Sequence, residues 1–531
     1  MLRLLVWTLT IAMALFGVLI AARAFHGPFA APVPVNSPLN VESFFGLAAI
    51  LLLLAQSKPS QPEPKKYVQR LDRRDAAVLG GLAVLVAAAF WGSARDYFLS
   101  DDFYHLKSKH DWHTVLAHFL QPGSDGFYRP LGDLSLALTS VWAGLSPVSW
   151  HAAGFALHAA NSMLLYLLAR RLKLSRLAAG FGAALFVLHG SRPEAVVWLA
   201  SRFDLLATFF VLLALLAFLA SWDQPGRFGA GYRAISLLAM LLALLSKESA
   251  YSLPLLLAVL LLSSGELLTR RSGFALAPYF AIAAGLLASR WLLFGGIGGY
   301  VDSQGRAEAL TPTIVPVVKL FALRLWAILF FPINWSIQPG LAVGLLMVLY
   351  VAALLLLFRV RLARRSLVVP MGFLLASCLP ALQQLMIGVD LEKARQLYLP
   401  AAGFCLLLAT LAEGLNRKAF WIAPIIVLAF QSAVLLHNLG GWADASERAK
   451  AACSVAAACQ DHKGRMAVIG LPSRLNGVYF FANGFRECVE QQGEGAAGDI
   501  DLYSPDQSWN RGDYSCVLRW NALQSELLPQ R

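Results

Sequence analysis

Charged residues are scarce in this chain. Of its 531 residues only 14% are Asp, Glu, Lys or Arg, whereas 58% are apolar. A soluble protein carries about a quarter charged residues, so this chain has too little polar surface to cover water-facing domains of its length. The composition excludes a soluble multidomain protein and predicts an all-α polytopic membrane protein.

Acidic residues are also few, 31 against 44 Lys plus Arg, and no internal repeat typical of solenoids or propellers is present. The resulting charge of +13 does not indicate a nucleic-acid partner, because the cations gather in short clusters between apolar runs. Such clusters are typical of the positive-inside rule of membrane proteins. The expected partner is therefore membrane lipid.

Apolar runs of about 20 residues cross a bilayer, and the chain holds roughly thirteen candidates, several of them short. The first, Leu4–Ala22, also resembles a signal peptide, but no clean cleavage site precedes Phe25, so we expect a retained helix. Another apolar run, Pro316–Phe331, is interrupted by two cations, and the sequence leaves open whether it crosses.

The cation clusters predict the orientation. With a cytoplasmic N-terminus and no crossing by Pro316–Phe331, all of them fall on the cytoplasmic side. We therefore expect a multi-pass protein of the bacterial inner (plasma) membrane, with its C-terminal segment in the periplasm. The clusters lie at Lys58–Arg74, Arg170–Arg176, Arg227–Arg233, Arg270–Arg271, Arg359–Arg365 and Arg417–Lys418.

The pattern predicts a division into four segments. Residues 1–57 form an N-terminal transmembrane hairpin, and residues 58–75 a basic cytoplasmic linker rich in proline. Residues 76–438 form the main transmembrane module, in which residues 96–149 are the first periplasmic loop. Residues 439–531 are more polar and carry turn signals, which predicts a small α+β periplasmic domain.

Cysteine placement agrees with this organisation. Two cysteines lie in apolar runs, where a small inert side chain is expected, and four fall in the polar C-terminal segment. An even set in an oxidising compartment predicts two disulfides, with three possible pairings. Zinc is the alternative, but no C-x-x-C pair is present. The four are Cys453, Cys459, Cys488 and Cys516.

Chemistry-bearing residues begin in the first external loop. Asp101 and Asp102 directly follow a membrane helix, either as a helix cap or as a general base whose neighbour raises its pKa. His110 and His113, spaced i, i+3, would share a helical face as metal ligands, although loop histidines are usually only solvated. The requirement for a divalent metal therefore stays open.

Further charges stand at the outer ends of later helices. Arg202 and Asp204 lie inside an apolar run, where charges mark either a structural ion pair or a functional site. Lys247, at a corner between two apolar runs, either binds a phosphate or extends to the lipid headgroups. The run Asp390–Pro400 has mixed charge, which is more typical of a solvated face. Their common side indicates chemistry on a lipid-linked substrate.

Several short motifs occur in a characteristic order. Together they resemble the C-type (GT-C) integral-membrane glycosyltransferases, in particular the protein O-mannosyltransferase branch that includes transmembrane mannosyltransferases with tetratricopeptide repeats. The resemblance covers residues 76–436, and no repeat array follows. The motifs are Asp101-Asp102-Phe103, Tyr128-Arg129-Pro130-Leu131, His189 to Glu194, Arg202-Phe203-Asp204, Ser246-Lys247-Glu248 and Leu397-Tyr398-Leu399-Pro400.

The resemblance implies a GT-C bundle with interfacial helices in its first external loop. It also implies transfer, with inversion, of a sugar from a polyprenyl-phosphate donor to an acceptor hydroxyl of a protein, lipid or surface glycan. By match to the motifs, Asp101 is the general base and Asp102 supports it, while Lys247, Arg202 and Arg395 hold the donor phosphate. The implied pocket residues are His189, Arg192, Glu194, Asp204, Glu248, Tyr128 and Arg129.

A transporter or flippase of a lipid-linked saccharide is the alternative. Transporters typically show two related halves and ionisable groups near the membrane midplane. Here the charged motifs stand at the ends of predicted helices, and the two halves show no evident symmetry. The sequence therefore favours the enzyme, without identifying the sugar or the acceptor.

Overall fold

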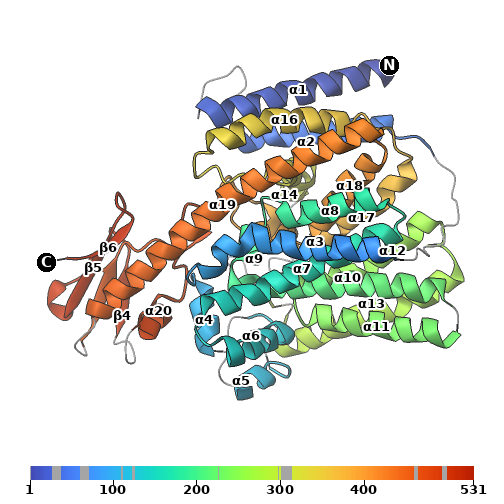
Figure 1. Ribbon diagram of the computed structural model, residues 1–531. Coiled ribbons are helices and arrows are strands. Elements are labelled where there is room, and N and C mark those ends of the chain that lie inside the picture. Colours follow the sequence, from blue (N-terminus) through green and yellow to red (C-terminus); the bar gives the residue numbers. More distant parts are fainter. Residues whose placement is uncertain are drawn as a thin grey trace.

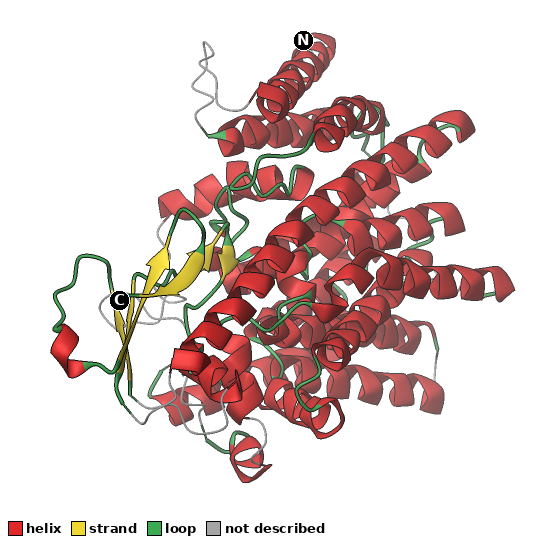
Figure 2. Cartoon of the chain, turned by 60° about the vertical axis from the view of Figure 1, so that its left-hand side comes forward, coloured by secondary structure: helices red, strands yellow, loops and turns green. Residues whose placement is uncertain are grey.

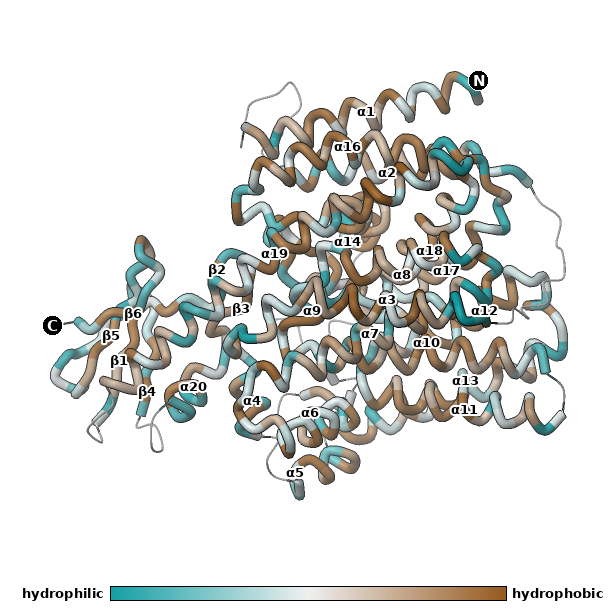
Figure 3. The backbone as a smooth tube through the Cα atoms, in the orientation of Figure 1, coloured by the Kyte–Doolittle hydropathy of each residue, from teal (hydrophilic) through white to brown (hydrophobic). Residues whose placement is uncertain are grey.

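The computed structural model contains a bundle of long helices and a small domain at one end (Figure 1). Because the helices carry apolar residues along most of their length, hydrophobicity marks the bundle, while polar residues are common in the small domain (Figure 3). The structure describes residues 2–26, 37–59, 71–108, 112–121, 126–224, 226–296, 298–299, 314–459, 464–492 and 499–530.

Within this described part, nine helices are long and apolar enough to cross a membrane, which confirms a multi-pass all-α fold. They are α1 (Leu2–His26), α2 (Pro38–Gln56), α3 (Arg73–Phe90), α7 (Pro147–Arg171), α10 (Arg202–Asp223), α11 (Gly226–Leu244), α13 (Arg270–Phe294), α17 (Arg364–Cys378) and α19 (Arg417–Cys459). Shorter apolar helices are α8 (Arg176–Leu188), α12 (Leu253–Ser264), α16 (Leu341–Leu357) and α18 (Pro400–Glu413). The count of thirteen crossings stays a prediction.

The apolar run after residue 313 forms one interrupted helix. It consists of α14 (Ile314–Lys319), a π-helical turn η5 (Leu320–Arg324) and α15 (Leu325–Phe330). All of α15 is buried, and it packs against α2 of the N-terminal hairpin. This segment therefore joins the hairpin to the main bundle.

Short elements connect the long helices near the small domain. The first loop holds α4, α5 and α6, in keeping with the helices expected there, and the other short elements follow α3, α8, α11, α17 and the 385–393 loop. They are η1 (Trp91–Arg95), α4 (Asp101–Ser108), α5 (Trp112–Ala117), α6 (Pro130–Ala143), α9 (Pro193–Val196), η2 (Leu199–Ser201), η3 (Glu248–Ser252), η6 (Leu379–Leu385) and η7 (Ala394–Leu397).

The C-terminal domain is α+β, as predicted, and its sheet stands beside the end of α19 (Figure 2). The four-stranded sheet has the order β4-β1-β5-β6, in which β1 runs parallel to both β4 and β5. The predicted boundary after residue 438 falls inside α19, which is one continuous helix of 43 residues. The elements are β1 (Met466–Ile469), β2 (Arg474–Leu475), β3 (Val478–Tyr479), α20 (Phe485–Gln492), β4 (Ile500–Tyr503), η8 (Arg511–Asp513), β5 (Cys516–Asn521) and β6 (Glu526–Pro529).

Two disulfides attach this domain to α19. Cys453 of α19 is bonded to Cys488 of α20, with 5.8 Å between their Cα atoms. Cys459, the last residue of α19, is bonded to Cys516 at the start of β5, with a Cα separation of 6.1 Å. Of the three pairings open from the sequence, this one fixes both the helix and the sheet of the domain to a single rod.

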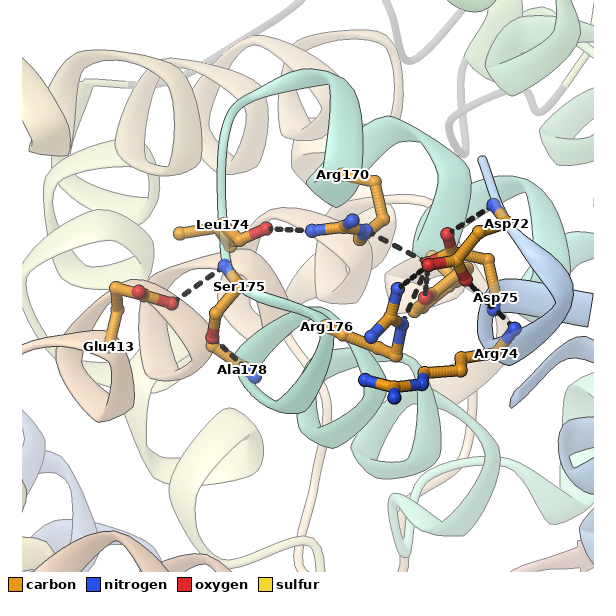
Figure 4. A network of polar contacts seen from close by, with 10 residues as sticks. Asp72, Arg74, Asp75, Arg170, Leu174, Ser175, Arg176, Ala178 and Glu413 are labelled. Atoms are coloured by element: carbon orange, nitrogen blue, oxygen red, sulfur yellow. Dashed lines mark hydrogen bonds and ion pairs between the residues drawn. The ribbon is translucent and has the colours of Figure 1, made fainter. Parts of the chain in front are cut away.

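The opposite end of the bundle carries a dense ionic cluster (Figure 4). The Oδ1 atom of Asp75 accepts hydrogen bonds from the Tyr166 hydroxyl at 2.5 Å, Arg170 Nε at 3.1 Å and Arg176 Nε at 3.3 Å. Asp72 caps α3, and the Asp75 side chain accepts from the Asp72 backbone in return. The cluster therefore ties α3, α7 and α8 together.

The predicted cation clusters meet at this same end. The Arg364 backbone N–H donates to Lys58 O at 2.8 Å, and Arg271 donates to the carbonyl of Trp222, next to the 227–233 cluster. Glu413, near Arg417, accepts from Ser175 N in the 170–176 turn. The common side deduced from the sequence is thus one end of the bundle, remote from the C-terminal domain.

Candidate active site

A cavity of about 730 Å³ lies where the bundle meets the C-terminal domain. It brings together segments that are far apart in the chain, and Asp101 and Lys247 both line it. Its described lining residues are Asp101, Tyr104, His105, Phe127, Arg129, Trp198, Ala200, Phe203, Asp204, Lys247, Gln384, Lys393, Arg395, Tyr479, Ala482, Asn483, Gly484 and Glu487.

Asp101 is a partly buried carboxylate at the start of α4. Its Oδ1 atom accepts a hydrogen bond from Asn483 Nδ2 at 2.7 Å and a longer one from Ser100 Oγ at 3.4 Å. Its Oδ2 atom has no partner among the residues that the structure describes. One oxygen is thus held, and the other is available to a proton.

The neighbouring Asp102 is buried and has a structural role. Only 2% of it is exposed, and its two oxygens accept from Ala200 N at 2.9 Å and from Leu99 N at 3.1 Å. Burial raises the pKa of Asp102, and the charge of Asp101 adds to that effect. Asp102 does not line the cavity, and it braces the start of α4 against η2.

Lys247 and Asp204 form a buried ion pair in the cavity wall. Lys247 Nζ lies 2.6 Å from Asp204 Oδ1, and both side chains are almost fully buried. Asp204 stands in the first turn of α10, where the helix dipole favours an anion. Lys247 comes from the corner between α11 and η3. The pair joins two helices and also places an ammonium group in the cavity.

Arg129 is held by Glu248 on the same side. Arg129 Nε and Nη2 donate to Glu248 Oε2 at 3.0 and 2.7 Å, while Arg290 donates to Oε1 at 3.1 Å. The Arg129 guanidinium also lies 4.0 Å from the centre of the Phe127 ring. Arg129 faces the cavity, whereas Glu248 stands behind it.

The start of η7 supplies two more cations, Lys393 at its N-cap and Arg395 within it. Arg395 is ion-paired with Glu194 and lies 4.6 Å from the centre of the Trp198 ring. Burial raises the pKa of Glu194, which Arg395 opposes by favouring its charged form. Lys393 also lines the cavity, and its side chain makes no ion pair with any described residue. Its φ of 71° is rare outside glycine.

Arg202, which was expected to hold the donor phosphate, lies away from the cavity. It donates to Thr139 Oγ1 and Trp150 O, both at 3.2 Å, and lines a separate, mostly apolar groove of about 450 Å³. Positions i and i+2 point about 200° apart on a helix, so Arg202 cannot face the cavity that Asp204 faces. The structure therefore does not place Arg202 with the other predicted phosphate ligands.

Several residues predicted to line the pocket are instead buried within the bundle, where they contact other helices and loops. His189 contacts Ser191 Oγ and Leu329 O, each at 2.9 Å. Arg192 is fully buried and lies over the rings of Phe186 and Tyr398, at 4.7 and 4.8 Å. None of the cavity-lining positions is His189, Arg192, Glu194, Glu248 or Tyr128.

The proposed histidine metal pair cannot be assessed, because His110 lies outside the described residues. Among the residues that are described, no group of three or more His, Cys, Asp or Glu is arranged to hold a metal ion.

Sequence reasoning missed the residues that the C-terminal domain adds to the cavity. Tyr479 stacks on Trp198, with ring centres 4.8 Å apart, and its hydroxyl donates to Glu392 at 2.9 Å. Asn483, Gly484 and Glu487 follow it along the wall. Lys393 was also missed, because a mixed-charge run gives no sign of which member faces a cavity.

No family model matches the chain. Among curated proteins it is similar to protein O-mannosyl-transferase Tmtc1 of Drosophila melanogaster, with 29% identity over 201 residues, 35% of this chain and 23% of that protein. It is 24% identical to human protein O-mannosyl-transferase TMTC4 over 395 residues, 62% of this chain and 53% of that protein. The chain thus matches about half of the longer-matching relative and about a quarter of the other.

Two solved structures show weaker similarity. ArnT from Cupriavidus metallidurans, bound to undecaprenyl phosphate, matches with a TM-score of 0.40 and 13% identity over 84% of this chain and 93% of that one. The S. cerevisiae protein O-mannosyltransferase Pmt1-Pmt2 complex, bound to the sugar donor, gives 0.33 and 15% over 47% and 37%. The resemblance to O-mannosyltransferases read from the motifs is confirmed by the curated relatives.

Proposed function

We propose that this protein is an inner-membrane glycosyltransferase of the GT-C kind. It takes a sugar from a polyprenyl-phosphate donor and transfers it to an acceptor hydroxyl, with inversion, in the cavity beside the C-terminal domain. One observation carries the proposal: Asp101, whose Oδ2 atom accepts no hydrogen bond from any described residue, shares a cavity with Lys247, Lys393 and Arg395. The similarity to named O-mannosyl-transferases supports the same class.

The reaction needs a base and a cationic site. Asp101 Oδ2 takes the proton of the acceptor hydroxyl as the acceptor oxygen attacks the anomeric carbon. The bond from that carbon to the phosphate oxygen breaks, and the electron pair leaves with polyprenyl phosphate. Attack opposite the leaving group inverts the anomeric centre. Fixed cations stabilise the charge that develops on the leaving phosphate.

The cations differ in what they offer that phosphate. Lys247 and Arg395 each have a carboxylate partner, Asp204 and Glu194, which holds them in place. Lys393 has no such partner among the described residues, so its charge is the least compensated in the cavity. We therefore add Lys393 to Lys247 and Arg395 as a ligand of the donor phosphate and leave Arg202 out.

Two independent features support a periplasmic cavity. The basic clusters gather at the opposite end of the bundle, which the positive-inside rule places in the cytoplasm. The disulfides lie in the C-terminal domain, which forms part of the cavity wall, and disulfides persist in oxidising compartments such as the periplasm. We accordingly propose that both substrates are used on the periplasmic side of a bacterial inner membrane.

The test mixes the purified protein with polyprenyl-phosphate mannose as the first donor, followed by other sugars, and with a protein, lipid or glycan that offers an acceptor hydroxyl. It measures release of polyprenyl phosphate. Asp101→Asn keeps the shape of the side chain and removes the base, so we expect turnover to fall at least about 100-fold. The matched control is Asp506→Asn, an exposed carboxylate of the C-terminal domain.

Wild-type turnover by Asp101→Asn would overturn the assignment of the base. Failure of every donor, together with movement of a lipid-linked saccharide across reconstituted vesicles, would replace the transferase with the flippase alternative.

A further inference from the structure

The C-terminal domain contacts the proposed base, Asp101, directly. The segment Phe480–Gly484, between β3 and α20, lies against the start of α4. Ser100 N donates to Phe480 O at 3.0 Å, and Asn483 N donates to Ser100 Oγ at 3.3 Å. The Asn483 side chain then donates to Asp101 Oδ1 at 2.7 Å. The orientation of Asp101 thus depends on residues 382 positions later in the chain.

Backbone conformation shows that the Phe480–Gly484 segment packs closely against Ser100. Ser100 has a φ of 48°, in the left-handed region that is unfavourable for residues other than glycine. Such residues persist where their surroundings hold them in place. Gly484 supplies that contact, since a Cβ there would lie 2.3 Å from the Ser100 carbonyl oxygen. Its own φ of 81° also favours glycine.

This segment of the C-terminal domain is itself anchored on both sides. Before it, Tyr479 stacks on Trp198 and donates to Glu392. After it, Cys488 is bonded to Cys453 of α19. The position of Asn483 is therefore fixed by the bundle as well as by its own domain, and it can transmit that position to Asp101.

We propose that Asn483 is the positioning residue of the base. By donating to Oδ1, it sets the rotation of the Asp101 carboxylate and leaves Oδ2 to accept the proton of the acceptor hydroxyl. This inference rests on the proposed function, and it assigns a catalytic contribution to the C-terminal domain.

The decisive variant is Asn483→Asp, which keeps the size of the side chain and places a second carboxylate beside Asp101. Two carboxylates that share a site raise the pKa of the pair, because both cannot easily be charged together. We expect the acidic limb of the kcat profile to move upward by about one pH unit or more. The shift would show that position 483 lies in contact with the base, and the companion variant below tests its positioning role.

The companion variant is Asn483→Ala, with Asn510→Ala as its control. Asn510 is an exposed asparagine between β4 and β5 that bonds only within its own turn. Loss of one charge-assisted hydrogen bond is expected to lower kcat about tenfold and to leave the donor KM within about twofold. Asn510→Ala is expected to keep wild-type kcat.

An unchanged pH profile in Asn483→Asp would overturn the inference, as would wild-type kcat in Asn483→Ala. These failures are distinct from failure of the proposed function. If Asp101→Asn is inactive while both Asn483 variants behave as wild type, the base assignment stands and only the role of Asn483 falls. If Asp101→Asn retains turnover, the assignment of the base falls, and the positioning role of Asn483 falls with it. If no donor is turned over by the wild-type protein, the proposed function itself falls.

Discussion

The two ends of the bundle both carry buried ion pairs, but they differ in whether each nearby carboxylate oxygen already accepts a hydrogen bond. At the end remote from the C-terminal domain, Asp75 Oδ1 accepts three hydrogen bonds and Oδ2 accepts another. At the cavity end, Lys247 and Asp204 are paired as closely, yet Asp101 Oδ2 lacks a partner among the described residues. Charge density alone therefore does not mark a site.

The energetic meaning of the pairs follows from this difference. A buried ion pair adds little net stability, because desolvation offsets the attraction, although breaking it by removing one partner costs about 3–5 kcal/mol. The cluster around Asp75 joins three helices, and both Asp75 oxygens already accept hydrogen bonds. The pairs in the cavity hold cations at a surface that a substrate can reach.

The largest loss of activity is expected from substitution of Lys247, which tests whether its ion pair with Asp204 has a role beyond stabilising the fold. Lys247→Met removes a cavity cation, and we expect turnover to fall about 100-fold. It also leaves Asp204 buried without its partner, so stability should fall by about 3–5 kcal/mol, measured by thermal unfolding in detergent. The double variant Lys247→Met with Asp204→Asn should recover stability without turnover. Recovery of turnover would make this pair as structural as the one around Asp75.

Substitution of Lys393 is expected to affect activity less, through the KM for the donor. The Lys393 side chain makes no ion pair with any described residue, so no partner is left unpaired. Lys393→Asn removes the charge, and asparagine tolerates the left-handed backbone found there. The KM for the donor should rise about tenfold, equivalent to one charge-assisted contact, with the unfolding temperature unchanged. The matched control, Lys450→Asn, alters an exposed lysine of α19. A donor KM within about twofold of wild type would exclude Lys393 from the phosphate site.

The smallest effect on activity is expected at the opposite end. Asp72→Ala removes the capping residue of α3 and an exposed ion pair with Arg176. Loss of the cap should lower stability by about 1 kcal/mol, while the exposed pair adds little. Turnover per folded molecule should stay unchanged in the same assay. A clear drop would show that the two ends are coupled, against the comparison drawn above.

The bundle could be predicted from the sequence because its signals are local. Apolar runs predict helices, and cations between the runs predict a common end. The meeting of Asp101 and Lys247 followed from their positions at the same ends of helices. Arg202 was misplaced because an apolar run shows that a charge is buried, but not which way it points.

Other features could not be predicted, because they depend on distant contacts. The link between Asn483 and Asp101 joins the first loop to the C-terminal domain without any local pattern. The continuity of α19 through the predicted domain boundary after residue 438 was also not evident, since glycines such as Gly440 and Gly441 are turn signals. A helix tolerates glycine at about 1 kcal/mol each, and Gly441 packs closely against Ile337, where a Cβ would lie 2.8 Å from Cδ1.

The continuous helix α19 has a consequence for substrate choice. At 43 residues it is about 65 Å long, roughly twice the hydrocarbon thickness of a bilayer. Because one stiff rod carries the domain that forms part of the cavity wall, the height of that wall above the lipid is set by how deep the rod sits. Under the proposed function, the cavity wall therefore stands at a fixed height, which limits the acceptors that can bring a hydroxyl to Asp101.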